Sequence, residues 1–506
     1  MKIKKWLLIL TVFCAILTIS IIFTACNNDN ANNNNNTDAD KSTDNLQQTD
    51  ESAPSETVEI NYYKNIPEDL NYGGYTFTII TWDPAKDGWS PYIDVEMITG
   101  EVLNDTAYNR NMEVSERLGI ELSFIYREIW NSPDLIDQVI KDIAADDCPY
   151  DIIIPWATST KNSSLITQNL LYDWKQVSYV DLSADWYKQN ASEAYTINGK
   201  QYFLISDFTY PLQGCGSPLL FNKDLFLDMG LDFPYQLVYN NKWTFDALYG
   251  YMKGAYVDLN NDGKKNYQDR YGLVTHPIML ARSIISWGEP TLKLDGNGFV
   301  LNIFNDKIAD MVTKLVDFRS GSDVFMSRTL SGDDGIYNIF NNGNALFEIF
   351  GSDPVLLRSI EFDFGYLPYP KYNEQQKDYI TDGGVGGMMG IPSIKTEEEA
   401  TRIGAVIEAF SESSAKYVKD AFIRQYIENK ILRDEDSVNM YRIMQNSAFY
   451  ELSPIFSAND LINSQLKYYV EILEKDSVNL ASQYEKHSAN LTAELEKIYE
   501  TIIGNQ

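Results

Sequence analysis

The residues whose spacing is most specific for a known chemistry lie between Asp258 and Asp269, in the stretch DLNNDGKKNYQD. Counted from Asp258, side-chain oxygens fall at positions 1, 3, 5, 9 and 12, and a glycine falls at position 6. A hard cation such as Ca²⁺ takes about six to eight oxygen ligands, which alternate residues of a tight loop supply, and the glycine permits the sharp turn. This EF-hand spacing predicts one calcium site. Its expected ligands are Asp258, Asn260, Asp262, Lys264 through its carbonyl, Asn266 and Asp269.

The last ligand of this loop departs from the usual pattern. Most EF-hand loops end in a bidentate glutamate, and Asp269 stands in that place. A shorter side chain would bind through one oxygen or along a different loop path. The alternative is a solvated turn rich in Asn and Asp that needs no cation. In extracellular millimolar calcium the site would stay filled, so we expect a structural staple rather than a sensor.

A second candidate site follows the apolar run Asp151–Ile154, which indicates a buried strand of a mostly parallel sheet. Pro155 ends the run, and Trp156 and the hydroxyl residues 158–160 come next. In open α/β sheets, ligands bind outside the carboxyl ends of the strands. Trp156 in that position would offer a stacking face with hydrogen-bonding hydroxyls beside it. The alternative is that Trp156 only covers the end of the sheet.

The elements that would position Trp156 alternate between strand and helix. A strand with alternating polarity ends at Trp82, and an amphipathic helix, a second strand and a second helix precede Asp151–Ile154. This βαβ order predicts an open parallel sheet in an α/β fold. The expected elements are the strand Gly74–Trp82, the helix Asn104–Leu118, the strand Ile120–Tyr126 and a helix that begins at Pro133 and Asp134.

The N-terminal segment is typical of a secreted protein. Lysines at positions 2, 4 and 5 precede the apolar run Trp6–Phe23, and small residues lead to Cys26. A polar tract, Asn27–Ser55, follows, and it cannot bury enough apolar surface to fold. The combination resembles a bacterial lipoprotein, which implies cleavage before Cys26, lipidation of its thiol and a flexible tether. A retained membrane anchor is the alternative, because the apolar run is about long enough to span a bilayer.

Composition excludes several classes of function. The net charge of −31 argues against binding to nucleic acid, whose affinity for proteins depends on cationic contacts with phosphates. The chain has only two histidines, His276 and His487, and neither has acidic or cysteine neighbours at metal-ligand spacing, so a histidine triad or a zinc site is not expected. Beyond the export segment, Cys148 and Cys215 could form a disulfide or remain free.

Motifs along the rest of the chain resemble one family. The stretch FNKDLFLDMGL (221–231), followed by Trp243 and Thr244 at the start of a helix, is similar to the extracellular solute-binding proteins of ABC sugar importers, and most of all to the maltose-binding type. Asp151–Ala157 matches that family's strand and its sugar-stacking tryptophan. Three later stretches, 340–347, 365–370 and 391–410, match further units in the same order, so the resemblance covers roughly residues 72–506.

The resemblance implies two α/β lobes, joined by hinge strands, with a ligand cleft between them. It divides the chain into a signal peptide (1–25), a lipidated cysteine and tether (26–57), a first lobe (58–213 plus 367–445) and a second lobe (214–366 plus 446–506). The stretch Leu461–Ile503 is helical by its pattern and would pack on the surface of the second lobe.

The resemblance and the strand ends together give the candidate ligand contacts. They are Trp82, Trp156, Ser159, Asp207, Tyr210, Trp287, Asp353 and Asp382. Core packing is the alternative for Trp82 and Trp287, and helix capping or turn formation is the alternative for the three aspartates. Ser159 stands near an acidic contact of the relatives, and Asp353 stands where they have an aromatic residue.

The expected function is therefore capture of an oligosaccharide outside the membrane by a monomeric, lipid-anchored protein that delivers it to an ABC permease. A peptide or polyol ligand remains open. One alternative is a glycoside hydrolase, since paired carboxylates in an aromatic cleft also describe such sites, although no motif singles out a pair. The other alternative is a sugar sensor that feeds a membrane kinase. The resemblance implies no enzymatic activity.

Overall fold

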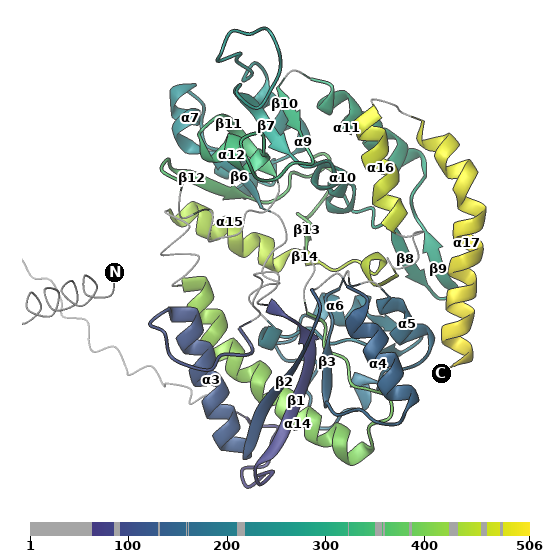
Figure 1. The fold of residues 1–506 in the computed structure, drawn as a ribbon. Helices are drawn as coiled ribbons and strands as arrows, with labels where there is room; N and C mark the ends of the chain where they lie inside the picture. Colours follow the sequence, from purple (N-terminus) through teal and green to yellow (C-terminus); the bar gives the residue numbers. More distant parts are fainter. Residues whose placement is uncertain are drawn as a thin grey trace, which may run out of the picture. The chain divides into compact units, whose positions relative to one another are not determined.

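The fold is described from a computed structural model (Figure 1). The structure describes residues 63–84, 92–129, 132–157, 159, 161–209, 218–321, 323–349, 357, 360–383, 387–424, 434–456, 463–475 and 479–505. The predicted signal peptide, Cys26, Tyr210, Cys215 and Asp353 lie outside these residues. Among the described residues, no helix has both the length and the apolar character that crossing a membrane requires.

A three-stranded parallel sheet of order β2-β1-β3 forms the centre of what we call the first lobe. Its strands are β1 (Tyr75–Trp82), β2 (Ile120–Arg127) and β3 (Ile152–Ile154), and the helices between them are α3 (Val102–Leu118) and α4 (Asp134–Ala144). The predicted order of strands and helices is confirmed here. Gly119 ends α3 in a left-handed conformation, with φ of 62°, so the chain turns directly into β2.

A five-stranded sheet of order β10-β7-β11-β6-β12 forms the centre of the second lobe. The strand β6 is antiparallel to both of its neighbours, and the pairs β11–β7 and β10–β7 are parallel. The strands are β6 (Leu219–Asn222), β7 (Tyr271–Thr275), β10 (Val324–Met326), β11 (Ala345–Ile349) and β12 (Phe364–Leu367). The helices of this region are α7 (Lys223–Asp228), α8 (Tyr235–Tyr239), α9 (Phe245–Met252), α10 (Pro277–Ser286), α11 (Asp306–Arg319) and α12 (Ile336–Asn341).

The chain returns to the first lobe after β12. Residues 387–392 form antiparallel bridges to Ile153, Trp156, Leu171 and Leu204 and so extend the first sheet. Helix α14 (Glu397–Ser413) then packs on α3 and continues as a π-helical segment, η3 (Ser414–Lys419). Helix α15 (Glu435–Asn446), which falls in the range predicted for the first lobe, packs against β12 and α8 of the second.

The C-terminal region differs from its prediction as one continuous helix. The structure describes two helices there, α16 (Asn463–Lys475) and α17 (Leu480–Gly504). Asn479, the residue directly before α17, has non-helical backbone angles (φ −88°, ψ 44°), and asparagine has poor helix propensity. Helix α17 packs on the hairpin of β8 (Leu292–Asp295) and β9 (Gly298–Leu301), and it also packs on α5 (Asn162–Thr167) of the first lobe.

The remaining elements are short. They are η1 (Trp174–Gln176), α6 (Gln189–Ala194), β4 (Thr196–Ile197), β5 (Lys200–Gln201), η2 (Asp207–Thr209), β13 (Thr381–Asp382), β14 (Ala448–Phe449) and η5 (Ser453–Phe456). The pair β13–β14 lies between the two larger sheets in the ribbon of Figure 1.

Candidate functional site

The aromatic residues at the carboxyl ends of β1 and β3 contact each other. The rings of Trp82 and Trp156 lie 5.3 Å apart at an interplanar angle of 88°, an edge-to-face arrangement. Both side chains belong to one buried cluster, in which Trp82 is 2% exposed and Trp156 is 8% exposed. Because parallel strands end at one edge of the sheet, the pair lies where ligands bind in open α/β sheets. Trp156 is the member that keeps some accessible surface, and Trp82 supports it from the side.

The loop after Trp156 is held by its own backbone. The carbonyl of Trp156 accepts hydrogen bonds from the backbone N–H of Ser159, at 2.8 Å, and from Nδ2 of Asn162, at 2.7 Å. Ser159 lies beside Trp156, as predicted, but its side chain is only 4% exposed. Asn162 is fully buried and fixes the path of the chain into α5. No motif in the sequence distinguishes this asparagine.

Gly387 brings a third segment to the tryptophan pair. Its backbone bridges to Trp156, and its carbonyl accepts a hydrogen bond from Oγ1 of Thr209 at 3.2 Å. A Cβ atom at this position would lie 2.7 Å from Cγ2 of Ile154 and 3.3 Å from the Trp82 ring, so only glycine fits. The Gly-rich character of this stretch was visible in the sequence, but its contact with the tryptophans was not.

Asp207 forms a buried ion-pair cluster. Its side chain is fully buried, and its two oxygens accept hydrogen bonds from Nζ of Lys188, at 2.7 Å, and of Lys419, at 3.0 Å. Lys188 precedes α6 and Lys419 lies in η3, so the carboxylate joins two elements that are distant in sequence. In the described structure, Asp207 therefore organises the segment that leads toward residue 210 rather than presenting a carboxylate to a ligand.

Arg110 supports the same segment from the other side. Its guanidinium lies 5.1 Å from the centre of the Phe208 ring and donates to Oγ of Ser414 at 3.1 Å. It also donates to Oδ1 of Asn111 and to the carbonyl of Tyr92. These acceptors are neutral, and burial lowers the pKa of Arg110 to about 9. Residues from α3, η2 and η3 are thus locked together.

Two further predicted contacts among the described residues, Asp382 and Trp287, have partners of their own. Asp382 on β13 accepts a hydrogen bond from Nη1 of Arg282 on α10, an ion pair that the sequence did not reveal. Trp287 is 2% exposed in the core of the second lobe, and its Nε1 donates to the carbonyl of Pro370 at 3.1 Å. The structure therefore groups Trp82, Trp156 and Ser159, with Asp207 connected to them through Thr209 and Gly387.

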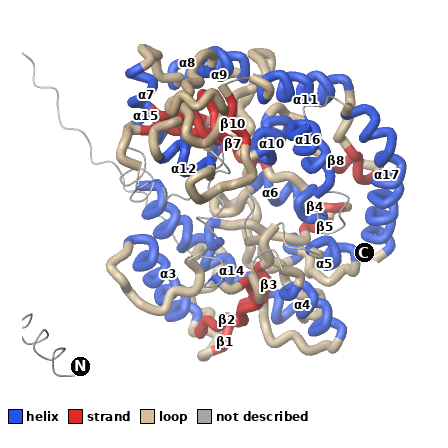
Figure 2. The backbone as a smooth tube through the Cα atoms, turned by 45° about the horizontal axis from the view of Figure 1, so that its top comes forward, coloured by secondary structure: helices blue, strands red, loops and turns tan. Residues whose placement is uncertain are grey.

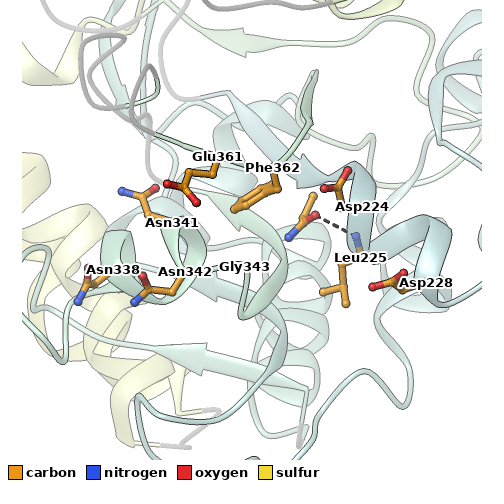
Figure 3. Close-up of a pocket in the computed structure, with 10 residues that line it drawn as sticks. Asp224, Leu225, Asp228, Asn338, Asn341, Asn342, Gly343, Glu361 and Phe362 are labelled. Atoms are coloured by element: carbon orange, nitrogen blue, oxygen red, sulfur yellow. Dashed lines mark hydrogen bonds between the residues drawn. The ribbon is translucent and has the colours of Figure 1, made fainter.

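A pocket in the second lobe lies at a different edge. It has a volume of about 740 Å³ and is polar, with four asparagines and three carboxylates among its lining residues (Figure 3). Asn222, at the end of β6, lines it, and Phe362 just before β12 does too. This is the edge where β11 and β12 begin, opposite the carboxyl ends of these strands, so the pocket is not part of the candidate cleft.

The predicted calcium loop forms a compact turn. Backbone N–H groups of Gly263 and Lys264 donate to Oδ2 of Asp258 and Oδ1 of Asp262, at 2.9 and 2.7 Å. Asp269 is fully buried, and its Oδ2 accepts a hydrogen bond from the Asn266 N–H at 3.1 Å. Gly263 has a φ of 73°, which the sharp turn requires.

Two carboxylate oxygens of this loop lack a hydrogen bond. Oδ1 of Asp258 and Oδ1 of Asp269, the first and last predicted ligands, are buried and without a partner. A buried charged oxygen is costly unless a donor or a cation compensates it. In the part of the chain that the structure describes, no three His, Cys, Asp or Glu side chains converge as a metal site. A cation here would therefore depend on these two carboxylates together with asparagine and carbonyl oxygens.

Comparisons with known proteins agree with the fold. The model of the bacterial extracellular solute-binding protein family matches residues 117–313. No curated protein matches the sequence. The family match and the two-lobed architecture confirm the predicted resemblance to extracellular solute-binding proteins.

Several solved structures share the fold at low sequence identity. A cyclo/maltodextrin-binding protein in complex with maltotetraose has a TM-score of 0.55 and 14% identity, over 84% of this chain and 98% of that one. The substrate-binding protein Lmo0181 from Listeria monocytogenes, in complex with cycloalternan, has a TM-score of 0.51 and 14% identity, over 86% and 100%. UspC of M. tuberculosis has a TM-score of 0.51 and 14% identity, over 83% and 100%.

Proposed function

We propose that this protein captures a carbohydrate, most simply an oligosaccharide, and delivers it to the permease of an ABC transporter. The observation that carries the proposal is the Trp82–Trp156 pair at the carboxyl edge of the first sheet, within a two-lobed fold. The C–H faces of sugar rings stack on aromatic surfaces, and sugar hydroxyls need fixed polar partners. The complexes with maltotetraose and cycloalternan support the choice of ligand class.

Binding would act through closure of the lobes. Hinge closure around a ligand is an established structural transition, and a ligand shifts the equilibrium only by its difference in affinity for the two states. Lipidation of Cys26 and the polar tether would hold a monomeric protein at the outer face of the membrane, where the closed form meets the permease. The family match supports an extracellular location.

Thermal unfolding of the tether-free protein with a panel of oligosaccharides, peptides and polyols tests this function. A ligand at about a thousand times its Kd should add roughly 4 kcal/mol of stability. Trp156→Phe should weaken the shift. The matched control is Trp174→Phe, because Trp174 is fully buried and donates to the carbonyl of Met389. A shift with peptides alone would exclude the carbohydrate proposal.

Assays on the same tether-free protein can distinguish oligosaccharide capture from the two alternatives, a glycoside hydrolase and a sugar sensor. Release of shorter products from a labelled oligosaccharide would favour the glycoside hydrolase, and binding without turnover would exclude it. A sensor would retain binding but fail to support uptake. Transport assays with the permease present distinguish that outcome from the proposed delivery.

We further propose that the loop Asp258–Asp269 binds a structural Ca²⁺ ion that stabilises the fold. The support is the EF-hand spacing together with the two buried, unpartnered carboxylate oxygens of Asp258 and Asp269. Removal of calcium with EDTA should lower the melting temperature, and Asp269→Asn should abolish that response. Asp295→Asn is the control, because Asp295 accepts hydrogen bonds in an ordinary hairpin turn. An unchanged melting temperature in EDTA would refute the proposal.

A further inference from the structure

The C-terminal helix α17 is buried at its two ends in different hydrophobic cores. Leu480 and Leu491 belong to the cluster that contains the strands of the second lobe. Leu495, Ile498 and Ile502 belong to the cluster that contains β1, α4 and α5 of the first lobe. These five buried residues recur at helical spacing, so one face of a single helix enters both cores.

Aromatic contacts fix the N-terminal part of α17 to the second lobe. The Tyr484 ring stacks on Phe304 at 5.1 Å, and the His487 ring stacks on Tyr468 of α16 at 5.2 Å. Tyr468 lies on α16, which packs against α10 and α11 of the second lobe. This end of α17 is therefore attached to the second lobe by side chains on two separate segments.

Hydrogen bonds and packing fix the C-terminal part to the first lobe. Nδ2 of Asn505 donates to the carbonyl of Thr167 at 2.7 Å, and Nδ2 of Asn169 donates to the Asn505 carbonyl at 2.5 Å. Thr167 is the last residue of α5. Figures 1 and 2 show the C-terminal end of α17 beside α5.

The β8–β9 hairpin makes a second connection beside the helix. It leaves the second lobe between α10 and α11, and its residues Leu292 and Phe299 join the first-lobe cluster. Phe299 packs edge-to-face against Tyr499 of α17 at 5.5 Å. A Cβ atom at Gly298 would lie 3.1 Å from the same Tyr499 ring, which shows how closely the hairpin and the helix approach. We call α17 and this hairpin (Leu292–Leu301) the brace.

We propose that the brace sets the angle between the two lobes in the ligand-free protein. An α-helix of 25 residues is about 37 Å long and cannot stretch, because its backbone hydrogen bonds run along its axis. A rotation of the lobes must therefore break or slide one of its two attachments. The attachment of α17 to the first lobe depends on few residues, so single substitutions there should weaken it.

Two adjacent isoleucines provide a matched test. Ile502 is 1% exposed in the first-lobe core, whereas Ile503, about 100° further around the helix, is 38% exposed. Spin labels on unnatural amino acids at the exposed positions Glu121 and Leu227, on β2 and α7, would report the distance between the lobes without ligand. Ile502→Ala should broaden this distance distribution or shift its mean, and Ile503→Ala should leave the wild-type distribution.

A second variant covers the case in which Ile502→Ala does not fold. Asn505→Ala removes the hydrogen bond from Nδ2 of Asn505 to the Thr167 carbonyl at an exposed position, so it should broaden the distribution while near-native stability is kept. A wild-type distribution in the folded variants overturns the proposal, as does equal broadening in Ile503→Ala. Because no ligand is present, this result is independent of whether the protein binds carbohydrate.

Discussion

At the scale of single residues, the Asp207 cluster shows how a predicted ligand contact can serve the fold instead. Its carboxylate accepts hydrogen bonds from two lysines while it is fully buried, and breaking such a pair leaves charges without a partner. Asp207→Asn should lower the free energy of unfolding by about 3 kcal/mol, the lower part of the range for buried pairs, because the lysines keep some contact with water. Chemical denaturation measures this loss.

The control for Asp207 is a nearby exposed pair. Asp420 contacts Arg424 at 2.6 Å, with side chains that are 52% and 72% exposed. Exposed pairs contribute about 0–1 kcal/mol, so Asp420→Asn should change stability little. Equal losses in the two variants would contradict the role assigned to burial at Asp207.

Glu451 gives a pH dependence at the same scale. It is buried, its Oε1 accepts hydrogen bonds from the backbone and hydroxyl of Thr291, and burial raises its pKa. A carboxyl whose pKa is higher in the folded state stabilises the fold below its unfolded pKa, near 4.3, and this contribution is lost as the pH rises through the folded value. Glu451→Gln mimics the protonated form.

The expected result is a pH-dependent difference between wild type and Glu451→Gln. The two proteins should have similar stability near pH 4, and the variant should become the more stable one as the pH rises toward 8. Melting curves over this range measure the difference. A constant difference at every pH would show that the pKa of Glu451 is the same in the folded and unfolded states, and it would contradict the raised pKa.

At the scale of elements, α14 has a complete capping box. Oγ1 of Thr396 accepts from the Glu399 N–H at 3.3 Å, and the Glu399 carboxylate accepts from the Thr396 N–H at 2.9 Å. Thr396→Ala should cost about 1 kcal/mol, as loss of an N-cap usually does. Thr401→Ala, within the same helix, is the control and should stay within about 0.5 kcal/mol of wild type in chemical denaturation.

The elements of the first sheet could be predicted from sequence because their signals are local. Strand β1 has alternating residues, and α3 ends at a glycine that the left-handed turn needs. Helix α4 has a continuous apolar face, formed by Leu135, Ile136, Val139 and Ile143. The start of α17 after Asn479 could not be predicted, since one residue of poor propensity does not interrupt an apolar pattern.

The site was harder to predict because its contacts are distant in sequence. Lys419 is 212 positions from Asp207, and Pro370 is 83 positions from Trp287. Nothing near Trp287 indicates that its indole N–H is bound inside the second lobe. Trp156 could be placed because the strand before it and the resemblance to solute-binding proteins both point to the sheet edge.

At the scale of the whole molecule, the core of the second lobe and the first-lobe cluster are connected by α17 and the β8–β9 hairpin as well as by the chain crossings at β12 and β13. The brace belongs to both cores, so domain boundaries drawn along the sequence do not coincide with boundaries in packing. Ligand affinity should therefore respond to substitutions far from the tryptophan pair. In the thermal-shift assay, Ile502→Ala should change the apparent Kd of whichever sugar binds, and Ile503→Ala should not.

The π-helical turn η3 has a consequence for insertions and deletions. A π-helical turn holds about one residue more than an α-helical turn. Deleting Ala415 would therefore let Ser414–Lys419 close as a regular α-helical turn, and the side chains after the deletion would keep their direction. Lys419 would still face Asp207. Homologues that lack one residue here should therefore keep this lysine–aspartate pair.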